Sequence, residues 1–267
     1  MVQHVYSIIG HPVGQARSPS IFNARFAAEG LDAVMVPLEV KPEDFGVALF
    51  GLRACANIAG IIVTVPHKLK AAALAARAST RVAALGAANV LRPHPDGWEA
   101  DLLDGAGFAT GLLGQGYVIA GRSAAVVGAG GAGLAISEAL LGHGATVDLS
   151  DIDDDRARDA VMRLRSLHGD AAQPGAPGKQ HSLAVNATPV GLDGDPRMPF
   201  DPVVLPARAI VAEVIMKPAR TPLLEAAAIL GLHTVEGRHM LDGQVQPIWD
   251  FLAMGGSVCR QTSTKRG

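Results

Sequence analysis

The chain has 267 residues, 31 of them glycine, and a net charge of −2 at pH 7. This length is enough for two domains with buried cores or for a single large one. A nearly neutral chain without a cluster of lysine and arginine argues against nucleic acid as a partner. Glycine, proline or charged residues interrupt every apolar run well before the ~18 residues that a membrane span requires. The N-terminus also lacks a secretion signal, so we expect a cytoplasmic protein without a membrane partner.

Cysteine and histidine give no sign of a metal site. Cys55 and Cys259 lie far apart and in no C-x-x-C pair, which argues against a disulfide framework and a zinc site. The nine histidines show no spacing typical of metal ligands. The acidic run 151–155 does not fit a calcium loop, because Arg156 stands where an EF-hand requires glycine. We expect no bound metal.

Strand-like and helix-like runs alternate in the first third of the chain. This order predicts a mostly parallel α/β sheet with an antiparallel hairpin at its edge. The first helix is expected to have Ser18 as its N-cap and Pro19 at its first position. The expected strands are 5–9, 33–38, 60–65, 89–91 and a return strand ending near 101. The expected helices are 18–29, 42–53 and 69–77.

A second α/β unit is expected after a helix that begins near Asp104. Its expected strands are 124–127, 146–150, 183–185 and 209–214, with a helix at 132–141, an exposed loop at 169–179 and a last helix from 238. We therefore predict a domain of residues 1–104 completed by the helix 238–255, a second domain of residues 105–237, and a flexible tail at 256–267.

The most informative motif is G-x-G-x-x-G at Gly128, Gly130 and Gly133. It follows an apolar strand-like run and precedes a helix that begins near Gly131. In a dinucleotide site the first glycine permits the tight turn, the second lets backbone approach the pyrophosphate, and the third lets the helix pack on the sheet. The helix N-terminus then faces the phosphates. A merely structural glycine-rich turn is the alternative, but the flanking strand and helix favour the nucleotide site.

Two polar residues stand where an α/β sheet usually binds its ligands. Lys68 follows a predicted strand and a proline, and Asp104 precedes a predicted helix. Taken alone, a solvated surface lysine and a helix N-cap explain both residues.

The motifs taken together resemble the shikimate dehydrogenase family over nearly the whole chain. They are Gly10-His11-Pro12 with Ser18-Pro19, Thr64-Val65-Pro66-His67-Lys68, Gly86-Ala87-Ala88-Asn89, Asp104-Gly105, the glycine motif, Asn186-Ala187-Thr188-Pro189-Val190-Gly191, Pro218 with Thr221-Pro222-Leu223-Leu224, and Met240-Leu241 with Gln244. The resemblance implies an α/β fold with an N-terminal substrate-binding domain and a C-terminal Rossmann domain, a doubly wound parallel sheet. It also implies that the last helix packs on the first domain and that the active site lies between the domains.

The activity implied by the resemblance is reversible, NAD(P)-dependent hydride transfer to or from a ring hydroxyl of a cyclic hydroxy acid, as with shikimate or quinate. Lys68 and Asp104 are the implied catalytic pair, because an ammonium beside a carboxylate can orient the hydroxyl and relay its proton. The implied substrate contacts are Ser18, Thr64, Asn89 and Gln244. The expected cofactor contacts are Gly128, Ala129, Gly130, Gly131, Ala132, Asp151, Asn186, Thr188 and Gly237. We expect a monomer or a homodimer.

Several positions depart from the family pattern, and each change removes hydrogen-bonding capacity. They are Ala16, Ile62, Leu102, Leu103 and Met216. A site built for a polar ligand loses about 1–3 kcal/mol for each buried partner left unmatched. The hypotheses are therefore weak turnover of shikimate, or a less polar or differently placed hydroxy acid as substrate. Gln15 or Arg17 could replace the missing carboxylate contact, although we interpret Arg17 as a surface residue.

Charge predicts the cofactor. The segment Asp151-Ile152-Asp153 replaces the Asn-Arg-Thr of NADP-preferring relatives, and a carboxylate there accepts ribose hydroxyls and repels a 2′-phosphate. NAD should be preferred, while Arg156 leaves NADP possible. We interpret His67 as exposed. A regulator that binds dinucleotide without catalysis is a further alternative, and the presence of both Lys68 and Asp104 argues against it.

Overall fold

A computed structural model describes residues 4–14 and 16–255. Gln15 and the tail expected at 256–267 lie outside the described residues. The chain divides into two compact units, one built from residues before 104 and after 244, the other from residues 104–244. The boundary between residues 244 and 245 falls inside the last helix. In the described part of the chain, no helix has the length and apolar character needed to cross a membrane.

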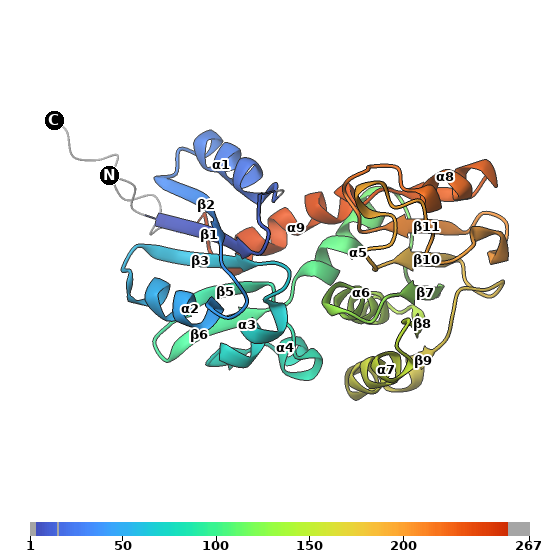
Figure 1. Cartoon of the computed structure of the whole chain (residues 1–267), viewed down its shortest axis with the longest axis horizontal. Helices are drawn as coiled ribbons and strands as arrows, with labels where there is room; N and C mark the ends of the chain where they lie inside the picture. The colour runs from blue at the N-terminus through green and yellow to red at the C-terminus, as the bar shows by residue number, and fades with distance from the viewer. Residues whose placement is uncertain (1–3, 15, 256–267) are drawn as a thin grey trace. The chain divides into compact units, whose positions relative to one another are not determined.

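The first unit contains a mixed six-stranded sheet in the order β2-β1-β3-β5-β6-β4 (Figure 1). Its strands are β1 His4–Gly10, β2 Ala33–Glu39, β3 Ile58–Val63, β4 Arg77–Ala78, β5 Val90–His94 and β6 Gly97–Asp101. Its helices include α1 Ser18–Ala28, α2 Phe45–Ala54, α3 Lys68–Leu74 and α4 Thr80–Leu85. Strand β1 pairs in parallel with β2 and β3, and the β5–β6 hairpin is antiparallel.

Three expectations for this unit were wrong. The β5–β6 hairpin is not at the edge of the sheet, because β4 pairs in parallel with β6 outside it. Strand β4 has two residues, too few to show a periodicity, and the sequence placed Arg77 in the preceding helix. The N-cap of α1 is Arg17 rather than Ser18, and no side chain makes a capping hydrogen bond there.

Aromatic side chains join α1 to the end of α9 (Arg238–Phe251) in the core of the first unit. Phe22 and Trp249 stack with ring centroids 6.4 Å apart, and the guanidinium of Arg25 lies 3.8 Å from the centre of the Trp249 ring. Each aromatic pair contributes about 0.5–1.5 kcal/mol beyond the area that it buries. The end of α9 is therefore part of the core that supports β1 and β3.

The second unit contains six parallel strands in the order β12-β11-β10-β7-β8-β9. Figure 1 shows β11, β10 and β7 as neighbouring arrows. The strands are β7 Ser123–Val127, β8 Thr146–Ser150, β9 Ala172–Pro174, β10 Leu183–Asn186, β11 Ile210–Glu213 and β12 His233–Val235. The helices are α5 Asp104–Gly114, α6 Gly131–Gly142, α7 Asp154–His168, α8 Pro222–Ile229 and the first part of α9. Short 3₁₀ turns lie at Gly169–Ala171, Leu192–Gly194 and Pro202–Val204.

This strand order is that of a Rossmann fold, as expected. Strand β7 pairs with β8 on one side and with β10 on the other. Successive strands are therefore added on one side of β7 up to β9 and on its other side from β10 onwards. Ligands of such sheets bind outside the carboxyl ends of the strands at this switch point. The exposed loop expected at 169–179 was wrong in part, because residues 172–174 form β9 and pair with β8.

Candidate functional site

The glycine motif forms the turn between β7 and α6. Gly128 has φ +107°, which L side chains rarely adopt, and a Cβ on it would lie 2.8 Å from the Ala187 carbonyl oxygen. A Cβ on Gly133 would lie 1.7 Å from the Gly128 carbonyl oxygen. Both glycines are therefore required by the packing of the turn, as their spacing predicted.

Gly130 differs from the other two glycines of the motif. Its backbone is extended, with φ −76° and ψ −176°, and a Cβ built on it would meet no atom within 4 Å. The fold alone thus accepts a side chain at this position. A glycine that the packing does not need, directly before the N-terminus of α6, fits a backbone that a phosphate approaches closely. The turn therefore has the open space that a dinucleotide requires.

This contrast predicts different effects of two alanine substitutions. Gly133→Ala should lower the free energy of unfolding by about 1–3 kcal/mol or more, because its Cβ collides with backbone. Gly130→Ala should leave the unfolding midpoint unchanged and weaken nucleotide binding by about tenfold or more, since the same overpacking occurs only with the ligand. Denaturant unfolding and nucleotide titration of both variants test this. Unchanged nucleotide affinity in Gly130→Ala would contradict the site.

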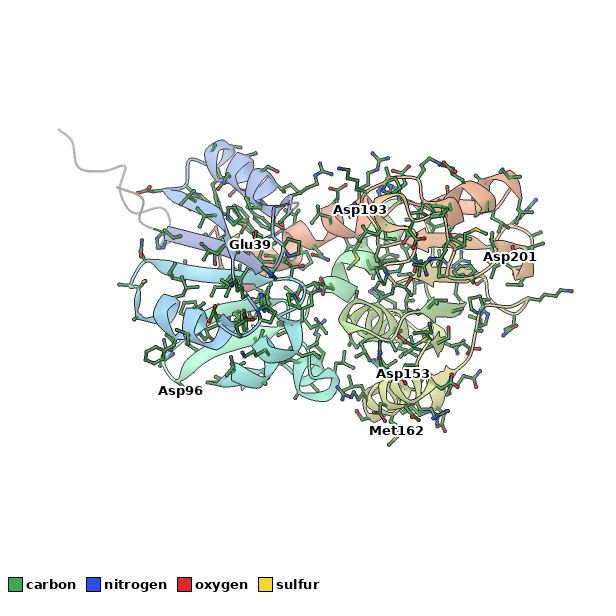
Figure 2. The ribbon with its side chains drawn as sticks, viewed as in Figure 1. Glu39, Asp96, Asp153, Met162, Asp193 and Asp201 are labelled. Carbon is green, nitrogen blue, oxygen red and sulfur yellow. The ribbon has the colours of Figure 1, made fainter. Side chains whose placement is uncertain are left out.

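Acidic residues gather where β8 ends. The carboxylate of Asp151 accepts hydrogen bonds from the backbone N–H of Ala129 (2.7 Å) and of Asp153 (3.0 Å). These use two of its roughly four lone-pair sites, so it retains acceptor capacity. The backbone N–H of Arg156 lowers the pKa of Asp153, which caps α7 (Figure 2). Ile152, between the two acids, is fully exposed. The β8 end therefore carries a mostly buried carboxylate at Asp151, an exposed one at Asp153 and an exposed apolar side chain between them.

Asn186 and Thr188 lie at the carboxyl end of β10, but their side chains bond mainly to each other and to nearby loops. Thr188 donates its hydroxyl and its backbone N–H to the Asn186 side-chain oxygen, at 2.7 and 2.9 Å. The Asn186 amide donates to the Val190 carbonyl (3.0 Å) and to the Glu213 carboxylate (3.1 Å). These two expected cofactor residues thus shape the loop. Gly237 likewise permits a close approach, since its Cβ would lie 2.3 Å from the Ile215 carbonyl oxygen.

An expected catalytic residue and an expected substrate residue meet in the second unit. The amide nitrogen of Gln244 donates to the carboxylate of Asp104 over 3.1 Å, and both side chains are buried. Asp104 begins α5, and two glycines bring that helix close to its neighbours. A Cβ on Gly105 would lie 1.9 Å from the Ala135 carbonyl oxygen in α6, and one on Gly107 would lie 2.1 Å from the Gln244 side chain. Small residues after Asp104 therefore position its carboxylate.

In the first unit, Thr64 lies on the short segment that follows β3, and Lys68 is the first residue of α3. His67, which precedes Lys68, is 1% exposed, so its expected exposure was wrong. Its ring stacks on Phe45 at 4.4 Å between centroids, and its Nε2 lies 2.8 Å from the Val40 carbonyl oxygen. Burial lowers the pKa of His67, which favours a neutral ring that donates from Nε2. The buried ring anchors the start of the helix that carries Lys68.

Two further expected substrate residues are buried in the first unit. The side-chain oxygen of Asn89 accepts a hydrogen bond from the backbone N–H of Leu103 (2.6 Å), and Ser18 is the first residue of α1. The carbonyl of Lys68 accepts from the N–H of Ala88, next to Asn89, at 2.9 Å. Backbone contacts thus place the β3–α3 segment beside the β5 strand that follows Asn89.

Three departures from the family pattern share one apolar cluster in the first unit. Ile62 and Leu103 are buried in it, and Ala16 packs against it. Apolar neighbours surround all three side chains. None of the three therefore brings a polar atom into the cluster that would need a hydrogen-bond partner there.

No metal-binding group was found in the parts of the chain that the structure describes. Within 4–14 and 16–255, no three histidine, cysteine, aspartate or glutamate side chains gather into a group that could hold an ion.

Comparison with known proteins identifies the family. A family model described as the shikimate dehydrogenase substrate binding domain matches residues 8–91. A shikimate dehydrogenase (NADP(+)) of Acidiphilium cryptum strain JF-5 is 35% identical over 240 residues, which cover 90% of this chain and 87% of that protein. The chain belongs to the shikimate dehydrogenase family. The resemblance inferred from the motifs is therefore confirmed.

Solved structures of family members and relatives share the complete fold. Shikimate 5-dehydrogenase from Listeria monocytogenes, in complex with shikimate and NAD, matches 94% of this chain and 92% of its own with a TM-score of 0.86 at 25% identity. Quinate dehydrogenase from Corynebacterium glutamicum, in complex with NAD, matches 94% of both chains with a TM-score of 0.84 at 26% identity. The expectation of a substrate-binding α/β domain and a Rossmann domain is thus confirmed.

Sequence reasoning missed the burial of two polar residues, Glu213 and His67. Glu213 ends β11 and is 1% exposed. A charged residue closing an apolar run before a turn also fits a solvated strand end, so nothing in the local pattern distinguished it. His67 was noticed for its place beside Lys68, but its burial depends on Val40 and Phe45 from other elements.

Proposed function

We propose that this member of the shikimate dehydrogenase family transfers hydride reversibly between a nicotinamide nucleotide and a ring hydroxyl of shikimate or a similar cyclic hydroxy acid. The observation that carries the proposal is the glycine turn, whose Gly130 offers an open backbone before α6. The relatives support it, because the similarity to the shikimate dehydrogenase from A. cryptum extends over most of both chains.

Lys68 and Asp104 are proposed as the catalytic pair. When bound, the nucleotide accepts or returns the hydride. During oxidation, the amine form of Lys68 takes the hydroxyl proton of the substrate at Nζ and becomes the ammonium, which the negative charge of Asp104 favours. The amide of Gln244 donates to Asp104 and holds the orientation of that carboxylate. We propose that Ser18, Thr64 and Asn89 hydrogen-bond the ring.

We propose that NAD is preferred over NADP. The β8 end carries Asp151 and Asp153 on either side of the exposed Ile152, so a 2′-phosphate would meet negative charge. The carboxylate of Asp151 can accept hydrogen bonds from ribose hydroxyls instead. Arg156, whose guanidinium lies 3.5 Å from Asp151, is the cation nearest to Asp151 among the described ion pairs and keeps NADP usable.

A second candidate is a less polar cyclic hydroxy acid. It is favoured by the shared apolar cluster of Ala16, Ile62 and Leu103, which replaces hydrogen-bonding groups near the expected substrate residues. A substrate with fewer polar groups would leave fewer of its own hydrogen bonds unmatched.

One assay distinguishes these candidates. Purified protein is given shikimate, quinate and cyclic hydroxy acids with fewer hydroxyl groups, each with NAD and with NADP, and the absorbance of the reduced nicotinamide is followed. Efficient saturation with shikimate supports the first candidate and contradicts the second. Higher kcat/KM with a less polar acid would reverse that conclusion, and no turnover of any of them would contradict both.

A further inference from the structure

Glu213 is a buried carboxylate that accepts hydrogen bonds from several segments of the second unit. Its Oε2 accepts from the Asn186 side-chain nitrogen (3.1 Å) and from the Thr221 hydroxyl (2.9 Å). Its Oε1 accepts from the backbone N–H groups of Val214 (3.0 Å) and Ile215 (3.3 Å). Each of these partners is a donor, so the arrangement suits the ionised carboxylate.

A carboxylate in this position is costly for stability. Burial raises the pKa of Glu213, and the hydrogen bonds from Asn186 and Thr221 only partly oppose that rise. A buried ionised group is destabilising unless it is well paired, and apolar residues of similar volume often pack at least as well. The cost indicates that the carboxylate holds its surroundings in a particular geometry.

The segments that bond to Glu213 all lie at the carboxyl ends of the parallel strands. Asn186 ends β10, and through its oxygen it also holds the backbone N–H and the hydroxyl of Thr188. Val214 and Ile215 follow β11, and Thr221 caps α8. One carboxylate therefore sets the positions of the loops that follow two neighbouring parallel strands.

The position of β10 and β11 in the sheet determines which half of a nucleotide their carboxyl ends face. The pyrophosphate belongs at the glycine turn after β7, and the adenosine ribose belongs at the β8 end with Asp151. The strands on the other side of β7 are β10 and β11. The remaining half of the dinucleotide, which carries the nicotinamide, extends across the switch point towards them.

We propose that Glu213 is a positioning residue for the nicotinamide half of the cofactor, and that it acts through Asn186 and Thr188, which shape the loop at 187–191. This inference rests on the proposed function, because it assumes that a nicotinamide nucleotide is bound. Glu213 itself needs no contact with the nucleotide.

The substitution Glu213→Gln tests the proposal selectively. The backbone N–H groups of Val214 and Ile215 can bond only an oxygen, so the glutamine nitrogen must take the Oε2 position. There it faces the Asn186 amide, which is also a donor and whose oxygen is already used by Thr188. The substitution therefore breaks the link to β10 while retaining the size of the side chain and its backbone bonds.

Binding of NAD and of ADP, which lacks the nicotinamide half, is measured by titration calorimetry. We expect Glu213→Gln to weaken NAD binding by about tenfold or more, the effect of losing a hydrogen bond to a charged group, and to change ADP binding by less than about twofold. The matched control is Glu225→Gln, the same chemical change at an exposed position of α8, which should alter neither affinity.

Equal weakening of NAD and ADP, or no weakening of either, would show a merely structural carboxylate and overturn the proposal. Should Glu213→Gln not fold, Thr221→Val removes one hydrogen bond to Oε2 together with the N-cap bond from the Leu224 backbone N–H, and the same selective loss of NAD affinity is then required. These measurements need no substrate. A wild-type protein that binds NAD but oxidises no cyclic hydroxy acid would therefore disprove the proposed function without deciding the role of Glu213.

Discussion

Replacing Lys68 with alanine is expected to lower kcat by about 10²- to 10⁴-fold, the range that a positioned acid–base group contributes. The alanine side chain cannot take or return the hydroxyl proton, so the transition state loses its proton acceptor. Nucleotide affinity should stay within about twofold, because the proposed nucleotide contacts lie in the second unit, whereas Lys68 begins α3 in the first. Single-turnover kinetics and nucleotide titration measure the two quantities.

Lys70→Ala is the matched control for this prediction. Lys70 lies in the same helix, is exposed, and donates to the Pro42 carbonyl oxygen at 3.0 Å. Its loss should leave kcat nearly unchanged. Asp104→Asn should also lower kcat, and the double variant Lys68→Ala with Asp104→Asn should be little worse than Lys68→Ala if the two act as a unit. Full turnover by Lys68→Ala would contradict the proposed role of Lys68. A wild-type protein that binds nucleotide but turns over no substrate would instead support the regulator.

Changing Ile152 to arginine is expected to shift cofactor preference towards NADP by about 10- to 100-fold in the ratio of kcat/KM values, since a bidentate contact between arginine and phosphate contributes about 1.5–3 kcal/mol. The side chain of Ile152 is fully exposed, so the substitution disturbs no packing. The new guanidinium would stand between Asp151 and Asp153, at the position where the family resemblance implies the arginine of NADP-preferring members. Steady-state kinetics with each nucleotide measure the ratio.

Met162→Arg is the control for charge alone. Met162 is 69% exposed in α7, the helix that follows the β8 end (Figure 2). The substitution Met162→Arg adds the same positive charge to the second unit, but not at the position of the expected phosphate contact. An equal shift in both variants would mean that long-range charge, rather than a local contact, sets the preference. A wild-type protein that already prefers NADP would contradict the argument from Asp151.

Local patterns predicted those elements whose sequence carries its own periodicity or turn chemistry. Strand β7, the turn at Gly128 and helix α6 were all expected, because a strand, three glycines and a helix follow one another within one short segment. Strand β4 was missed, since its two residues are held by pairing with β6 and not by their own preference. The same reason explains β9, which is held by β8.

The identities of the candidate site residues came from the sequence, but their environments came from contacts between distant segments. The motifs and their order along the chain identified Lys68, Asp104 and the glycines as candidate site residues, because each motif is short and contiguous. The sequence did not show that Gln244 donates to Asp104, that His67 is enclosed by Val40 and Phe45, or that Glu213 joins β10, β11 and α8.

The amino-acid sequence alone therefore determined the family, the presence of a Rossmann domain and the residues proposed for chemistry. Only the tertiary structure decided which polar groups are buried and which hydrogen bonds they use. Burial depends on the side chains that other strands and helices bring to a residue, and no local pattern records those neighbours. Gly130 and Gly133 are the same residue type in one motif, yet folding leaves open space beside the first and a carbonyl oxygen against the second.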